Sequence, residues 1–211
     1  MAKVQGIKEK LHWPLYDAFV VPEKNGGPAP TFQTEMDKRD SRILRFFVDV
    51  QNKTRLETNL QSSGTLPSLN SYEVRALRVV VSPVLRHLRP HKDEPTKDSD
   101  NVLADLIYNS VTSLIVGEKT MIEMPTYYFP AGAGVSPGNQ SLPSHGQPDP
   151  MATFRFSEPV PIEPNQNFRV EMLFPQKVPT GTGSGTLRLG DATGPMRLWV
   201  VLDGYLTRDV Q

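Results

Sequence analysis

Prolines occur along the whole chain and limit what it can fold into. The sequence has 20 prolines among 211 residues, and they are spread rather than clustered. This is roughly twice the ordinary usage. A proline lacks a backbone N–H and blocks the interior of a helix. Long helices are therefore disfavoured over most of the chain, and short strands joined by many loops are favoured.

Two apolar runs between the prolines have the pattern of β-strands. Residues Phe168–Phe174 alternate apolar and mostly charged side chains, which is typical of a strand with one face on a core and one in solvent. The run Met196–Tyr205 is apolar on both faces, which predicts a central strand or one covered by a partner. The residues that we predict to be buried in these runs are Val170, Met172, Leu198 and Val200.

Further segments have strand character and complete an all-β inventory. A short Gly117 turn between residues 113–116 and 120–124 predicts a hairpin. The other predicted strands are Ile43–Val50, Tyr72–Val81, Thr153–Ser157 and the region of Leu187 and Leu189. A parallel α/β fold needs a helix after nearly every strand, which this chain does not offer. We therefore predict an antiparallel β-sandwich, a single jelly roll with one short helix and long loops.

The one helix that the sequence predicts spans residues 101–108. Ser99 or Asp100 precedes it as a capping residue. Leu103, Leu106 and Ile107 recur at helical spacing, so we expect them to form its apolar face.

The chain divides into an extended N-terminal arm, residues 1–40, and a jelly-roll β-sandwich domain, residues 41–211. The arm contains the aromatic residues Trp13, Tyr16 and Phe19, which are expected to dock either on the protein's own β domain or on a neighbouring subunit. They are the candidate subunit contacts. The long loops 86–100 and 130–150 are further candidate contact elements, since loops of this length in a compact domain are usually functional or disordered.

The sequence offers no recognisable catalytic, metal or cofactor site. It has no cysteine, so disulfides, thiolate metal sites and cysteine nucleophiles are excluded. His87 and His91 have the spacing of a helical metal pair, but Pro90 lies between them. The Gly181–Gly185 run lacks the lysine of a phosphate-binding loop. The chain is therefore predicted not to be an enzyme and to bind no cofactor.

Two further kinds of site are considered, a pair of catalytic carboxylates and an aromatic platform that binds sugars. Paired carboxylates could be drawn from Glu158, Glu163, Glu171, Asp191 and Asp203, but sequence cannot place any two across a cleft, and solvated strand faces account for them more simply. The aromatic residues that could form a sugar-stacking platform are Trp199, Tyr205, Tyr127, Tyr128 and Phe129. Packing in a core is the alternative fate of this set.

Charge and hydropathy limit the kinds of partner that the chain is expected to bind. The chain has 23 basic and 23 acidic residues, so no general attraction to nucleic acid or to an anionic membrane follows, and no specific nucleic-acid binding is expected. No apolar run approaches the length of a membrane span, and the N-terminus lacks the apolar core of a signal peptide. We expect synthesis in a cytoplasm.

The order of features resembles that of a known class of viral proteins. An arm precedes Thr58-Asn59-Leu60, a Gly-x-Leu-Pro turn at 64–67, a hairpin ending in Met124-Pro125 with Phe129-Pro130-Ala131-Gly132, the segment Pro161–Phe168, and a last strand containing Leu202-Asp203-Gly204. This resembles single jelly-roll capsid proteins of tailless icosahedral bacterial and archaeal viruses.

The resemblance implies a coat subunit and no active site. Its partners would be copies of itself, other capsid proteins and an internal viral membrane beneath the shell, and its location would be the virion. The alternative is a carbohydrate-binding or receptor-binding β-sandwich of a spike or attachment protein. Exposed aromatic residues in a row would favour the alternative.

Overall fold

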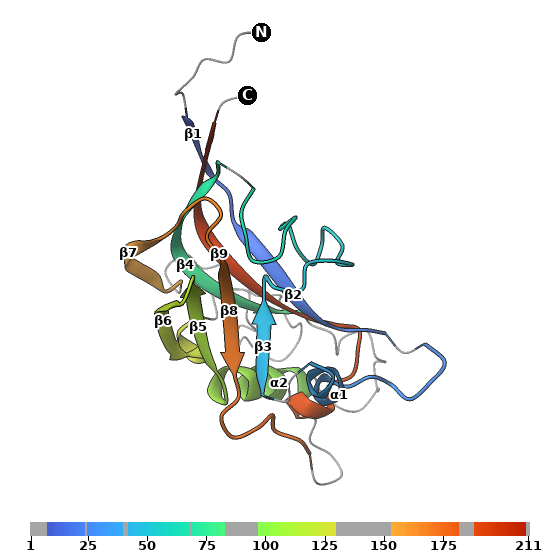
Figure 1. Cartoon of the computed structure of the whole chain (residues 1–211). Coiled ribbons are helices and arrows are strands. Elements are labelled where there is room, and N and C mark those ends of the chain that lie inside the picture. Colours follow the sequence, from blue (N-terminus) through green and yellow to red (C-terminus); the bar gives the residue numbers. More distant parts are fainter. Residues whose placement is uncertain are drawn as a thin grey trace.

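The strands form two antiparallel sheets that pack face to face (Figure 1). The computed structural model describes residues 8–23, 25–39, 42–67, 69–82, 97–129, 153–181 and 188–209. The five-stranded sheet contains β1 (Lys8–His12), β2 (Leu15–Val21), β4 (Ser71–Val81), β7 (Arg155–Ile162) and β9 (Met196–Asp209). The four-stranded sheet contains β3 (Ile43–Phe46), β5 (Val111–Val116), β6 (Lys119–Pro125) and β8 (Phe168–Leu173).

The order of the strands is that of a jelly roll. Strands β1 and β2 both pair with β9, along successive parts of its length, and together form one edge of their sheet. The sheets then run β1/β2-β9-β4-β7 and β3-β8-β5-β6. Counted in this way, the first strand pairs with the last, the second with the second last, and so inward to the β5–β6 hairpin. This nested antiparallel pairing confirms the predicted fold.

The core lies between the two sheets, as the alternating patterns predicted. Four residues were predicted to be buried from these patterns, and each is 0% exposed: Val170, Met172, Leu198 and Val200. Strand β9 is central because it pairs with β4 on one side and with β1 and β2 on the other.

The expectation of an extended arm over residues 1–40 needs correction. Residues 8–21 form two strands of the sheet, and α1 (Phe32–Asp37) follows them. Thr31 caps this helix, since its hydroxyl accepts from the Thr34 N–H while the Thr34 hydroxyl accepts from the Thr31 N–H. Phe32 is fully buried, so this segment belongs to the sandwich. The chain thus has a second α-helix that the sequence did not predict.

Two local predictions were wrong in detail. The strand predicted over Ile43–Val50 ends at Phe46, because Phe47 takes a positive φ of 69°. Phe46 and Phe47 are consequently both buried, rather than on opposite faces. Leu189 lies in a short 3₁₀ helix, η3 (Leu189–Asp191), and not in a strand, while Leu187 falls outside the described residues.

Helix α2 (Lys97–Tyr108) begins before the predicted residue 101, and of the three residues predicted for its apolar face only Leu106 is fully buried. Val102 and Leu106, one turn apart, are buried in the core, and Asp105 is buried beside them. Leu103 and Ile107 are only partly buried. The predicted loop 86–100 therefore ends in a helix, whereas residues 86–96 and the loop 130–150 lie outside the described residues.

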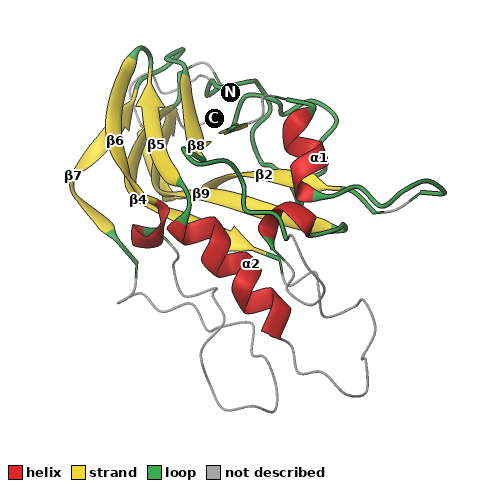
Figure 2. Ribbon diagram, turned by 90° about the horizontal axis from the view of Figure 1, so that it is seen from below, coloured by secondary structure: helices red, strands yellow, loops and turns green. Residues whose placement is uncertain are grey.

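The helices lie away from the outer face of the four-stranded sheet. Figure 2 shows α2 on the side of β4 and β9, and α1 beyond the β2 end. Neither helix crosses β5 or β6 in this view. Within the described part of the chain, no helix is long and apolar enough to cross a membrane.

Candidate contact surfaces

Of the three predicted subunit contacts, one is a core residue. Phe19 is 3% exposed, and its ring packs edge-on against Phe32 at 5.2 Å between centroids. Phe19 is therefore unavailable to a neighbouring subunit, which corrects that prediction. Strand alternation explains the difference, since Phe19 stands opposite Leu198 on the inner face of its sheet.

Tyr16 and Trp13 remain at the surface in different ways. Tyr16 is half-buried, and its hydroxyl donates to the carbonyl of Arg55 at 2.5 Å. Trp13 is 49% exposed and leaves a large apolar area in solvent. Its carbonyl accepts a hydrogen bond from the Tyr72 hydroxyl, so its backbone is fixed while its indole is not enclosed.

The free edges of the five-stranded sheet are protected against strand addition. Residues 58 and 59 lie along the edge of β2. Thr58 forms an isolated β-bridge with Asp17, and the side-chain oxygen of Asn59 accepts a hydrogen bond from the backbone N–H of Tyr16. Pro161 stands opposite Glu73 in the β4–β7 ladder, and its nitrogen cannot donate to a neighbouring strand. Lysines on β1 give the same protection. Contacts of the five-stranded sheet with other molecules would therefore be made through side-chain surfaces.

A row of exposed tyrosines lies where α2 and η2 (Thr126–Tyr128) meet. Tyr108 is 71% exposed, Tyr127 47% and Tyr128 45%. The ring centroids of Tyr108 and Tyr127 are 6.1 Å apart, and those of Tyr127 and Tyr128 are 4.9 Å apart and nearly stacked. Phe154 closes the row edge-on against Tyr128. We call Tyr108, Tyr127 and Tyr128 the tyrosine row.

The five aromatic residues proposed from sequence as a sugar-stacking platform do not come together. Phe129 is fully buried. Trp199 and Tyr205 lie on β9 in the other sheet, and the Trp199 indole N–H donates to the carbonyl of Leu56. Of the five, only Tyr127 and Tyr128 are exposed side by side. The third residue of the tyrosine row, Tyr108, was not predicted from the sequence. The residue's position at the end of a helix gave no sign that it would meet η2.

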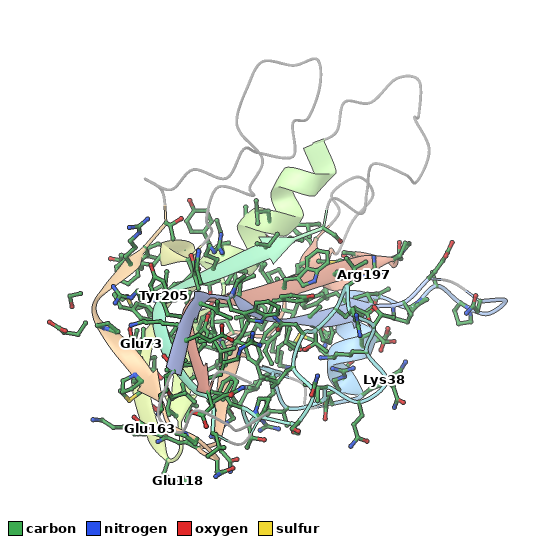
Figure 3. The ribbon with its side chains drawn as sticks, turned by 90° about the horizontal axis from the view of Figure 1, so that it is seen from above. Lys38, Glu73, Glu118, Glu163, Arg197 and Tyr205 are labelled. Atoms are coloured by element: carbon green, nitrogen blue, oxygen red, sulfur yellow. The ribbon has the colours of Figure 1, made fainter. Side chains whose placement is uncertain are left out.

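Tyr205 lies in a network of charges on the outer face of the five-stranded sheet. Figure 3 shows Tyr205 close to Glu73. Lys10 and Arg75 lie over the Tyr205 ring at 5.2 and 5.0 Å. The Lys10 ammonium also donates to both carboxylate oxygens of Glu73, at 2.8 and 2.9 Å. This hydrogen bond, with a further one from Arg75, lowers the pKa of Glu73.

The outer face of the four-stranded sheet carries an apolar row that crosses all four strands. Ile43 stands opposite Leu173, Leu173 also stands opposite Val111, and Val111 stands opposite Pro125. Leu173 is 37% exposed and the other three are partly exposed. These four residues, the apolar row, lead towards Tyr127, two residues beyond Pro125.

A charged row lies next to the apolar row, two residues away along each strand. Arg45 stands opposite Glu171, Glu171 opposite Ser113, and Ser113 opposite Glu123. Arg45 and Glu123 lie on the two edge strands and are exposed. Glu171 is held between Arg169 at 2.8 Å and Arg45 at 3.5 Å.

Three of the five carboxylates considered for catalysis have separate structural partners. The Asp203 carboxylate lies 2.6 Å from the His12 imidazole and 3.5 Å from the Arg78 guanidinium. Asp191 accepts from the backbone N–H of Gly181. Glu171 belongs to the charged row, on the other sheet from Asp203.

Metal-ligating residues do not cluster in the part of the chain that the structure describes, where no group of three or more histidine or carboxylate side chains could hold an ion. His87, His91 and His145 lie outside the described residues.

Comparisons with known protein families, with curated proteins and with solved structures find no match to this chain.

Proposed function

We propose that this protein is a capsid subunit that associates with copies of itself to build an icosahedral viral shell. The observation that carries the proposal is the nested strand order β1/β2-β9-β4-β7 and β3-β8-β5-β6. Jelly rolls of this kind are typical of viral capsid and lectin domains. The proposal places the protein in the virion, with other capsid proteins and an underlying viral membrane as further partners.

The surface of the chain is consistent with lateral packing of many copies. Its net charge is zero, so copies packed side by side would not repel each other strongly. The protected edges of the five-stranded sheet would hinder open-ended strand addition through that sheet, which would otherwise lead to fibres. Trp13, the tyrosine row and the apolar row leave apolar surface exposed, and contiguous surface of this kind marks contact sites.

Electron microscopy of the purified protein over a concentration series tests the proposal. We expect closed shells of uniform size at high concentration, and many copies per particle in virions from the native source. A protein that stays monomeric at every concentration would contradict the coat role. So would particles containing only a handful of copies, which would indicate a spike.

The tyrosine row supports a second candidate, a carbohydrate-binding attachment domain. Tyrosine rings combine an apolar face with a hydroxyl, so an exposed row can stack on sugar rings and bond their hydroxyls. A glycan array with the wild type, and with Tyr127→Ala and Tyr128→Ala, tests this reading. Binding that both variants lose, and that Trp13→Ala keeps, would establish it. No binding by the wild type would remove it.

A further inference from the structure

We propose that the outer face of the four-stranded sheet binds the same face of a second copy of this chain. The two copies would be related by a two-fold axis that runs parallel to the strands, between β8 and β5. The inference rests on the proposed self-association and deepens it, because it names the contacting face and the symmetry of the contact.

The order of the four strands determines which residues would meet. A two-fold axis in the interface keeps the position along each strand and exchanges the two edges of the sheet. Strand β3 of one copy therefore faces β6 of the other, and β8 faces β5. The apolar row then faces itself, with Ile43 against Pro125 and Leu173 against Val111. Apolar surface left in solvent by one copy would be buried by the other.

The charged row is also complementary to itself under this rotation. Arg45 on β3 meets Glu123 on β6 of the second copy, and the converse pair forms at the opposite edge. Glu171 meets Ser113, so no two like charges of this row face each other. The two Arg45–Glu123 pairs lie at the rim of the interface. Rim charges select partner and register more than they add affinity.

The charge balance of this face favours a second copy over a partner of one sign. Two arginines, Arg45 and Arg169, balance two glutamates, Glu123 and Glu171. A strongly acidic partner such as nucleic acid would gain little from this surface. The surface instead matches its own rotated image, which is the requirement for an isologous interface, and two-fold dimers are the commonest closed homo-oligomers.

The absence of cysteine from the sequence allows a direct test in the full chain. We would prepare Arg45→Cys and Glu123→Cys separately, mix them, and add a bismaleimide that spans about 10 Å, the spacing of stacked sheets. The mixture should form a cross-linked dimer, because the apolar row is intact in both variants. Each variant alone should stay unlinked, since identical positions lie on opposite edges of the dimer.

The matched control is Glu73→Cys, which places a cysteine on the outer face of the five-stranded sheet. Mixed with Arg45→Cys, it should give no cross-link. Cross-linking that is equal for Glu73→Cys and Glu123→Cys would mean random collision, and a missing link between positions 45 and 123 would mean that the faces do not meet. Either result overturns the inference.

A charge exchange tests the pairing without any reagent. Arg45→Glu and Glu123→Arg should each raise the dimer dissociation constant about tenfold in sedimentation equilibrium. The double variant should bind more tightly than either single variant, because the pairs re-form with their signs reversed, but it should not regain the full affinity, because Arg45→Glu also removes the ion pair with Glu171 of the same chain. Circular dichroism checks that each variant keeps its β signal. A double variant that binds no better than the single ones would contradict the pairing.

The outcomes separate this inference from the coat proposal. Shells that form without a link between positions 45 and 123 would keep the coat role and overturn this interface. A dimer linked at these positions in a protein that never forms shells would establish the interface and overturn the coat role. A protein that remains monomeric in every measurement overturns both.

Discussion

The Lys53 ammonium lies 2.8 and 2.9 Å from the two carboxylate oxygens of Asp17, a residue on the inner face of β2 that is 0% exposed. The same carboxylate accepts the backbone N–H of Phe47 at 2.7 Å. Phe47 has a positive φ, so the strand that precedes it ends there. One buried carboxylate thus joins the edge of one sheet to the end of β3 in the other.

Removing this carboxylate should strongly destabilise the fold. In Asp17→Ala the Lys53 ammonium and the Phe47 N–H lose their partner in a buried site. We expect a loss of about 3–5 kcal/mol in the free energy of unfolding, measured by urea denaturation. The matched control is Lys10→Ala, which breaks an exposed pair with Glu73 and should cost about 1 kcal/mol or less. Equal losses would show that Asp17 is not a buried anchor.

The sequence predicted the sandwich far better than it predicted this junction. The alternation from Phe168 to Phe174 is local and regular, so its inner face could be named in advance. Asp17 sits in an apolar run, where a charged residue suggests a loop rather than a strand. Its partners lie 30 and 36 residues further along the chain, and no local pattern identifies them.

The prediction of an extended arm over residues 1–40 was wrong for a similar physical reason, since the partners of this segment are also distant in sequence. Pro14 interrupts residues 8–21, so neither β1 nor β2 has an alternation long enough to stand out. Both strands form because β9, nearly two hundred residues later, offers a long central ladder. The apolar row was equally invisible in the sequence. Its members come from four different strands and become neighbours only through the register of the sheet.

Phe19 and Trp13 should respond to truncation in opposite ways. Phe19→Ala leaves a cavity against Phe32 and should cost about 3–5 kcal/mol in stability. Trp13→Ala removes an indole that is half in solvent, so it should lower stability much less and weaken self-association instead. Urea denaturation and sedimentation velocity measure the two effects. If Trp13→Ala leaves association unchanged, this residue is not a subunit contact.

Truncation of Leu198 and of Leu173 should change the stability of the monomer by very different amounts. Leu198 is 0% exposed on the central strand, and Leu198→Ala should cost about 2–5 kcal/mol in the free energy of unfolding. Leu173 is 37% exposed on the outer face, so Leu173→Ala should stay within about 0.5 kcal/mol for the monomer. A large loss at Leu173 in dilute solution would show that this side chain already packs within one copy.

Acid should remove the stabilising effect of Glu73. Its pKa is lowered by the hydrogen bond from Lys10, which favours the ionised carboxylate in the folded protein. A lowered folded pKa means that the contribution is complete above the pKa of the unfolded chain, about 4.3 for glutamate, and is lost as the pH falls through the folded value. The free energies of unfolding of the wild type and Glu73→Gln should therefore differ at pH 7 and converge in acid. The difference should be small, and smaller still in high salt, because the Glu73 side chain is 37% exposed. A difference that persists unchanged to pH 2 would show that the ionised carboxylate is not its cause.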